Sequence, residues 1–174
     1  FRSHGITRDP LCMRRISDGP WYYEQIDLGY NYRMTELQAA LGVSQMERLD
    51  EYVAKRHLLS SRYDRLLKDF PVIIPSHHSD SYSGLHLYVI RLQLRHMKKT
   101  HREVFEGFLK GGIGVNLHYI PIHLQPYYRR MGFKEGDFPN AEGYYSEAIS
   151  LPIYPALTEV EQDLVIEVFK ELLR

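Results

Sequence analysis

The chain has 174 residues, of which 44% are hydrophobic and 25% are charged, and its 22 basic and 22 acidic side chains give a formal net charge of zero. This length is sufficient for one compact domain with a hydrophobic core, or for one domain with an additional segment. The balanced charge gives no electrostatic argument for a nucleic-acid or membrane surface, and no apolar run approaches the roughly 18 residues needed to cross a bilayer.

The first residue and the single cysteine indicate the context of the chain. Phe1 stands where a complete chain would have Met, and no secretory signal pattern is present, so we expect a part of a longer protein. Cys12 is the only cysteine, which excludes an intrachain disulfide and favours a reducing compartment. We therefore expect a cytoplasmic protein.

Residues 1–34 lack a sustained hydrophobic period. Gly5, Pro10 and the Gly19-Pro20 pair are typical of loops. Because this segment has too little apolar pattern to form a core alone, we expect it to be the trailing segment of a domain that lies upstream.

A helix is predicted to begin at Thr35, because "TELQ" is a capping box in which Thr35 and Gln38 satisfy early backbone amides reciprocally. Apolar residues then recur at near-helical spacing as far as Pro71: Leu37, Ala40, Leu41, Leu49, Val53, Leu59, Tyr63, Leu66 and Leu67. Gly42 and "DEYV" at 50–53 could bend or split this helix. A helix over 35–70 would be much longer than the average in a globular domain, which is typical of a helix that bridges two domains.

Residues 71–174 have the pattern of an α+β domain. Alternating β-formers predict strands, and two further capping boxes, Thr100 with Glu103 and Thr158 with Glu161, mark helix starts. In chain order we expect a strand at 85–94, a helix at 100–112, a strand at 113–121, a helical turn at 125–132, a short helix at 140–149, a brief strand at 149–155 and a last helix at 158–174. Helices on one side of a small sheet would bury a core of plausible size.

Asn31 and Arg33 stand directly before the predicted helix start. The exposed amides of a helix start favour an anion, Asn31 can donate to a phosphate oxygen, and the guanidinium of Arg33 can clamp one with two donors. The alternative is that both side chains satisfy backbone groups of the turn. The residue types alone do not decide between these two possibilities.

The second candidate is "NLHYIPIHLQPYY" at 116–128. Helical metal pairs are about three or four residues apart, whereas His118 and His123 are separated by five positions and have no third ligand nearby, so we predict no metal site. His118, Tyr119 and His123 can instead line a cleft and hydrogen-bond a sugar or a phosphate. The alternative is a half-buried loop in which the histidines have protein partners.

Four segments, "RSHGITRD", "LGYNYRMTELQAALG", "GIGVNLHYIPIHLQPYY" and "AISLPIYPALTEVEQDLV", occur in one order. Together they resemble the carboxy-terminal half of the DegT/DnrJ/StrS family of sugar aminotransferases. The sequence of residues 113–128 is most similar to that of the branch that makes UDP-4-amino-4,6-dideoxy sugars, as in pseudaminic acid or spore coat polysaccharide synthesis. The resemblance covers almost the whole chain.

This resemblance implies the aspartate-aminotransferase (PLP type I) fold. Residues 1–34 would then be the trailing segment of the large, cofactor-binding domain, 35–70 the interdomain helix, and 71–174 the carboxy-terminal small α+β domain. It implies an enzyme that uses pyridoxal 5'-phosphate to move an amino group from glutamate to a keto group of a nucleotide-linked deoxysugar. It also implies a homodimer whose two subunits share each active site.

The same resemblance implies roles for the candidate residues. Asn31 would reach the cofactor phosphate bound by the dimer partner, and Arg33 would lie in the same shared pocket near the substrate. His118, Tyr119 and His123 would approach the nucleotide-sugar. The family's cofactor-bearing lysine lies before "RSHG", and none of the lysines in this sequence has its context: Lys55, Lys68, Lys98, Lys99, Lys110, Lys134 and Lys170.

No catalytic residue is therefore assigned, and the chain by itself should not transaminate. Two alternatives stay open. One is a sugar dehydratase of the same family, in which a histidine replaces the lysine upstream. The other is a catalytically silent interaction domain that uses the long helix and the tyrosines as an interface. Which keto-sugar, nucleotide and carbon atom are involved is also left open, and apolar surface on the long helix predicts self-association.

Overall fold

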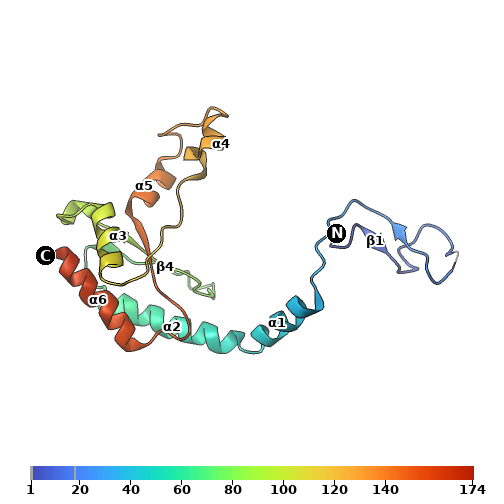
Figure 1. The fold of residues 1–174 in the computed structure, drawn as a ribbon, viewed down its shortest axis with the longest axis horizontal. Helices are drawn as coiled ribbons and strands as arrows, with labels where there is room; N and C mark the ends of the chain where they lie inside the picture. Colours follow the sequence, from blue (N-terminus) through green and yellow to red (C-terminus); the bar gives the residue numbers. More distant parts are fainter. Residues whose placement is uncertain (1, 18) are drawn as a thin grey trace. The chain divides into compact units, whose positions relative to one another are not determined.

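The computed structural model describes residues 2–17 and 19–174, and the chain divides into two compact units, residues 1–49 and 50–174 (Figure 1). In the first unit, β1 (Ile6–Thr7) pairs antiparallel with β2 (Glu24–Gln25). A single antiparallel bridge joins Ser3 to Asn31. The segment that was predicted to have no core therefore contains a small two-stranded sheet. Its beginning, at Ser3, also pairs with Asn31, which lies shortly before the first helix.

The predicted long helix is two helices. α1 (Glu36–Met46) ends before Glu47, and α2 (Leu49–Leu66) begins two residues later. Gly42 lies inside α1 and does not interrupt it. The break falls just before Asp50 and Glu51, whose carboxylates in the first turn of α2 stabilise a helix amino terminus.

The second unit contains a three-stranded antiparallel sheet in the order β3-β4-β5. β3 (Val72–Ile73), which the sequence analysis missed, pairs with β4 (Tyr88–Leu92), and β4 pairs with β5 (Ala148–Leu151). Alternate residues of β4 are buried, as expected for a strand with one face on the core. All four residues of β5 are buried.

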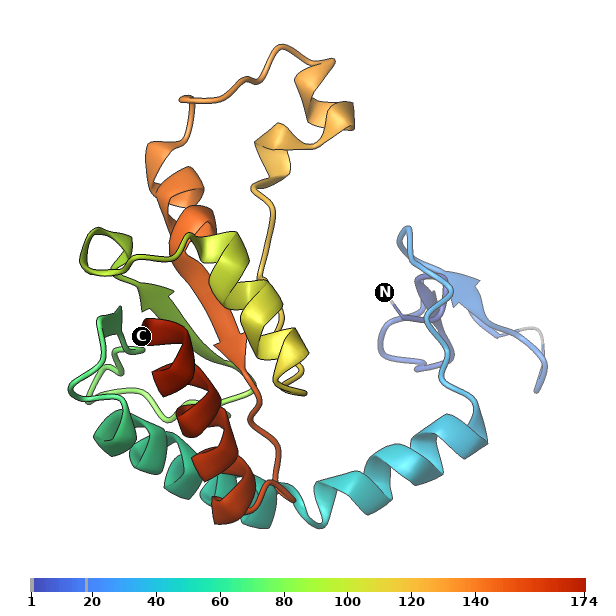
Figure 2. The same cartoon turned by 60° about the vertical axis from the view of Figure 1, so that its left-hand side comes forward.

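Helices cover one face of this sheet. Figure 2 shows α3 (His101–Lys110) and α6 (Glu159–Leu173) side by side in front of the strands. Their buried faces, together with α2, form one hydrophobic core: Leu59, Tyr63, Leu67, Tyr88, Ile90, Leu92, Val104, Phe108, Ile113, Ile149, Leu151, Ile153, Leu157, Val165, Ile166 and Phe169. Short elements complete the unit, namely η1 (Leu94–His96), η2 (Ile122–Leu124), α4 (Pro126–Arg129) and α5 (Pro139–Glu147).

The predicted strand at 113–121 is wrong. Only Asn116 pairs with β5, through hydrogen bonds to Ser150 of 3.2 and 2.8 Å. β-forming composition is not sufficient for a strand when a single residue reaches the edge of the sheet. The chain then leaves the sheet, and residues 119–138, here called the projecting segment, carry η2 and α4 away from it (Figure 1).

The predicted strand at 85–94 is shorter than expected. Leu85 has φ of +45°, outside the β region. Arg56 of α2 also donates to the carbonyls of Leu85 and His86, at 3.0 and 3.1 Å, so these groups are not available to the sheet. The strand therefore begins at Tyr88.

Two tyrosines are part of the core. The Tyr63 hydroxyl donates to the Pro152 carbonyl at 3.1 Å, and the Tyr88 hydroxyl donates to the Asp64 carboxylate at 2.6 Å. Burial raises the pKa of both hydroxyls, and Asp64 raises that of Tyr88 further. These two rings therefore pack in the core with satisfied hydroxyls, and any tyrosine that contacts a ligand lies elsewhere in the chain.

Candidate functional site

The loop that carries Asn31 is held by its backbone. The amide of His4 donates to the Tyr30 carbonyl and the amide of Tyr32 donates to the Arg2 carbonyl, both at 2.9 Å. The rings of Tyr30 and Tyr32 stack with centroids 4.9 Å apart, so these two side chains share one face. Because side chains alternate along an extended segment, Asn31 and Arg33 project toward the opposite face.

The side chains of Asn31 and Arg33 are exposed, and within residues 2–17 and 19–174 neither makes a hydrogen bond or an ion pair. The capping box satisfies the helix start instead: Gln38 Oε1 accepts from the Thr35 amide at 3.0 Å, and Thr35 Oγ1 accepts from the Gln38 amide at 3.3 Å. The alternative in which Asn31 and Arg33 satisfy the turn is therefore not what the structure contains. An amide and a guanidinium with unused donors fit a phosphate.

His118 lies two residues after Asn116, the residue that pairs with Ser150 of β5. Its Nδ1 is 2.7 Å from the hydroxyl of Ser150, a residue that is only 5% exposed. The His118–Tyr119 peptide bond is cis, and the two rings contact edge to face with centroids 4.6 Å apart. Tyr119 is 72% exposed, so its hydroxyl faces solvent. These two residues are accessible to a ligand, in contrast to the second histidine of the motif.

His123, on η2, is 7% exposed. Its Nε2 lies 2.7 Å from Glu142 Oε1 on α5, and its ring packs against Phe138 with centroids 4.8 Å apart. For this histidine the structure agrees with the alternative of a satisfied, buried side chain. The two histidines meet different partners: His118 meets Ser150, and His123 meets Glu142.

Glu142 was not singled out by the sequence analysis. Besides His123, its carboxylate accepts from the amide of Gly136 at 2.9 Å and, at 3.4 Å, from that of Phe138. The hydrogen bond from His123 is the main reason that the pKa of Glu142 is lowered, and the two amides add to it against the effect of burial. An acid in the first turn of a helix that starts with proline was the available signal, but its partners lie outside that turn.

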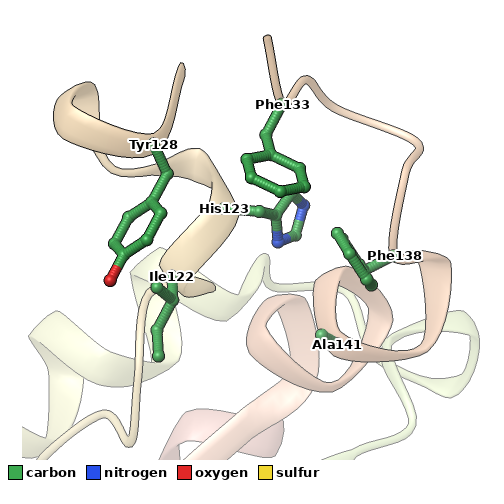
Figure 3. Close-up of a pocket in the computed structure, with 6 residues that line it drawn as sticks. All are labelled: Ile122, His123, Tyr128, Phe133, Phe138 and Ala141. Carbon is green, nitrogen blue, oxygen red and sulfur yellow. The ribbon is translucent and has the colours of Figure 1, made fainter. Parts of the chain in front are cut away.

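An apolar pocket of about 430 Å³ lies beside this pair (Figure 3). Rings from η2, α4 and the connection between α4 and α5 form its walls, and α5 contributes Ala141. The lining residues are Ile122, His123, Tyr128, Phe133, Phe138 and Ala141. The carboxylate of Glu142 thus holds the connection that supplies Phe133 and Phe138.

We expect acid to release the projecting segment from α5. A lowered carboxyl pKa contributes stability that is present above the pKa of the unfolded chain, about 4.3, and that is lost as the pH falls through the folded value. The amide proton shifts of Gly136 and Phe138, followed by NMR from neutral pH into acid, should therefore change together. In Glu142→Gln the same transition should be absent, and its persistence would contradict the assignment.

Within the part of the chain that the structure describes, no group of three or more His, Cys, Asp or Glu side chains could hold a metal ion. No described helix is long and apolar enough to cross a membrane.

The α+β unit and these two motifs correspond to a known family of proteins. The model of the DegT/DnrJ/EryC1/StrS aminotransferase family matches residues 1–170, and the chain belongs to this family. This confirms the resemblance and the fold class predicted from the sequence.

Individual relatives agree with this family assignment. The chain is 38% identical over 174 residues to the spore coat polysaccharide biosynthesis protein SpsC of Bacillus subtilis, covering 98% of this chain and 44% of that protein. It is 32% identical over 155 residues to the UDP-4-amino-4,6-dideoxy-N-acetyl-beta-L-altrosamine transaminase of Campylobacter jejuni, covering 88% of this chain and 38% of that protein. The chain thus spans less than half the length of these relatives.

Solved structures show the same fold. Helicobacter pylori PseC, described as an aminotransferase involved in the biosynthesis of pseudoaminic acid, superposes with a TM-score of 0.81 at 27% identity, over 99% of this chain and 44% of that one. The PMP-form of the sugar aminotransferase Spr1654 from Streptococcus pneumoniae has a TM-score of 0.81 at 29% identity, over 98% of this chain and 42% of that one.

Proposed function

We propose that the intact protein is a pyridoxal 5'-phosphate-dependent aminotransferase. It moves an amino group from glutamate to a keto group of a nucleotide-linked deoxysugar used for surface polysaccharide. Family membership and the names of the relatives support this activity. The observation in this chain that carries it is the pair of unused donors, Asn31 and Arg33, on one face of a loop directly before a capped helix.

The roles proposed for the single residues are those that the family resemblance implies. The Asn31 amide donates to an oxygen of the cofactor phosphate, while Arg33, two residues further on the same face, clamps an anionic or hydroxyl group of the substrate. His118, Tyr119 and His123 belong to the substrate side. When bound, the cofactor supplies the electron sink for the transfer. Residues 1–34, 35–70 and 71–174 would be the end of the large domain, the interdomain helix and the small domain.

We further propose a cytoplasmic homodimer with shared active sites. α1 has no buried residue, and its apolar side chains Leu37, Leu41, Val43 and Met46 are 63–85% exposed. Such a helix normally packs on another surface. The exposed free thiol of Cys12 fits a reducing compartment.

Asn31→Ala in the intact protein should raise the Kd for pyridoxal 5'-phosphate about 10- to 100-fold, because one hydrogen bond to a charged group is lost. Equilibrium dialysis measures this directly. Asn140→Ala, on the exposed surface of α5, serves as the matched control. An unchanged Kd in Asn31→Ala would contradict the contact with the phosphate, and no cofactor binding by the unsubstituted protein would favour the silent interaction domain.

Mixed dimers test whether Asn31 acts across the interface. Asn31→Ala protein is mixed with a variant that lacks the upstream cofactor-bearing lysine, and the subunits are allowed to exchange. If Asn31 serves the partner's cofactor, one site of each mixed dimer has both groups, and amino transfer reappears. A mixture no more active than its two components would contradict sharing.

A further inference from the structure

Ser150 occupies an unusual place for a hydroxyl. It lies in β5, where its residue pairs with Val89 of β4 on one side and with Asn116 on the other. Its side chain is buried, and within the described residues its hydroxyl makes one hydrogen bond, to His118 Nδ1 at 2.7 Å. A strand position of this kind usually carries an apolar side chain, so the hydroxyl calls for a functional explanation.

This hydrogen bond determines which ring nitrogen of His118 carries the proton. A buried hydroxyl without an acceptor costs free energy, and the only acceptor that Ser150 meets among the described residues is Nδ1. If Ser150 donates, the neutral imidazole accepts at Nδ1 and therefore carries its proton on Nε2. Nε2 has no partner in the described part of the chain, so it remains available as a donor.

The second histidine of the motif is arranged in the opposite way. Its Nε2 is already bonded to Glu142, and its ring lines the apolar pocket and packs against Phe138 (Figure 3). His123 is 7% exposed, and its contacts with Glu142 and Phe138 serve the position of the projecting segment.

We propose that Ser150 is the positioning residue that sets this tautomer of His118, so that Nε2 donates its proton to an oxygen of the nucleotide-sugar that the family resemblance implies at this motif. His123 is a positioning residue that acts with Glu142. The identity of the ligand rests on the proposed function. The oxygen belongs to the diphosphate or to the sugar, and both accept from a neutral imidazole in the same way.

The ligand part is tested with a double-mutant cycle on the intact protein, using UDP and UDP-N-acetylglucosamine as probes in calorimetry. His118→Ala should weaken binding about 10-fold and Ser150→Ala about 3- to 10-fold. In the His118→Ala background, Ser150→Ala should have no further effect, because its action passes through the imidazole. Ser60→Ala, which removes another buried hydroxyl, from α2, is the control.

The two probes distinguish the two sources of the oxygen. Weakened binding of both probes assigns the contact to the diphosphate, and weakened binding of UDP-N-acetylglucosamine alone assigns it to the sugar. The proposal is overturned if His118→Ala leaves both affinities unchanged, or if Ser150→Ala still weakens binding in the absence of the imidazole. His123→Gln, which keeps a donor for Glu142, should recover part of the affinity that His123→Ala loses.

The tautomer is measured without any ligand, by long-range ¹H–¹⁵N NMR of the intact protein under conditions in which the ring is neutral. A proton on Nε2 with Nδ1 as acceptor supports the proposal, and a proton on Nδ1 overturns it. Transamination that is absent while the probes still bind and depend on His118 would count against the proposed function alone, so the two failures are distinguishable.

Discussion

Phe169→Ala is expected to lower the free energy of unfolding of residues 50–174 by about 3–5 kcal/mol. Phe169 lies on α6 with no exposed surface, and its ring is 5.2 Å from the rings of both Phe70 and Phe108. Truncation removes the ring that joins α6 to α3 and to Phe70 in the turn between α2 and β3. Because these elements are tied to the sheet, the cavity cannot close by a local shift.

Urea unfolding followed by far-UV circular dichroism measures this loss. The matched control is Val160→Ala on the same helix, since Val160 is 78% exposed and its truncation should change stability by less than about 0.5 kcal/mol. Similar midpoints for the two variants would mean that Phe169 is not central to the core.

Gly5→Ala is expected to disrupt the loop that presents Asn31. Gly5 has φ of +69°, which costs a residue with a Cβ atom about 1–2 kcal/mol. A Cβ at Gly5 would also lie 2.0 Å from the carbonyl oxygen of Asp27, a backbone atom that cannot rotate away. The pairing of Gly5 with Ile26 must open to relieve this contact. We therefore expect a loss of more than about 2 kcal/mol in this unit and, under the proposed function, cofactor binding at least as weak as in Asn31→Ala.

Hydrogen exchange at the amides of His4, Ile26 and Tyr32, each bonded across this small sheet, reports the opening. Gly42→Ala is the matched control, because no atom lies within 4 Å of the added Cβ and the position is inside α1, where alanine should stabilise by about 0.5–1 kcal/mol. Unchanged exchange at these three amides in Gly5→Ala would contradict the argument.

The helix starts were the most predictable features. The capping boxes at Thr35, Thr100 and Thr158 form as expected, with both hydrogen bonds present in each. The residues involved are three positions apart, so no distant contact is needed. The division of the long helix was predicted only as a possibility, because neither Glu47 nor the residue after it is a helix breaker.

The strands were less predictable, because each one forms only with a pairing partner that is distant in the sequence. β4 and β5 follow the predicted pattern, but residues 113–121 have strand composition without strand pairing, since the edge of β5 accepts only Asn116. The two-residue strand β3 forms because Val72 lies opposite Leu92, a partner that local pattern cannot reveal.

Through its local patterns and family motifs, the sequence by itself determined the helix caps, the α+β class and the family, and it marked Asn31, Arg33, His118, Tyr119 and His123 as candidates. Only the tertiary structure decided which partners the two histidines meet. Both stand in one short motif with similar neighbours, and the difference arises from Ser150 and Glu142, which are 32 and 19 residues away from them. A histidine's role is set by the group that its ring nitrogens meet, and that group is brought to it only when the strand and the helix pack.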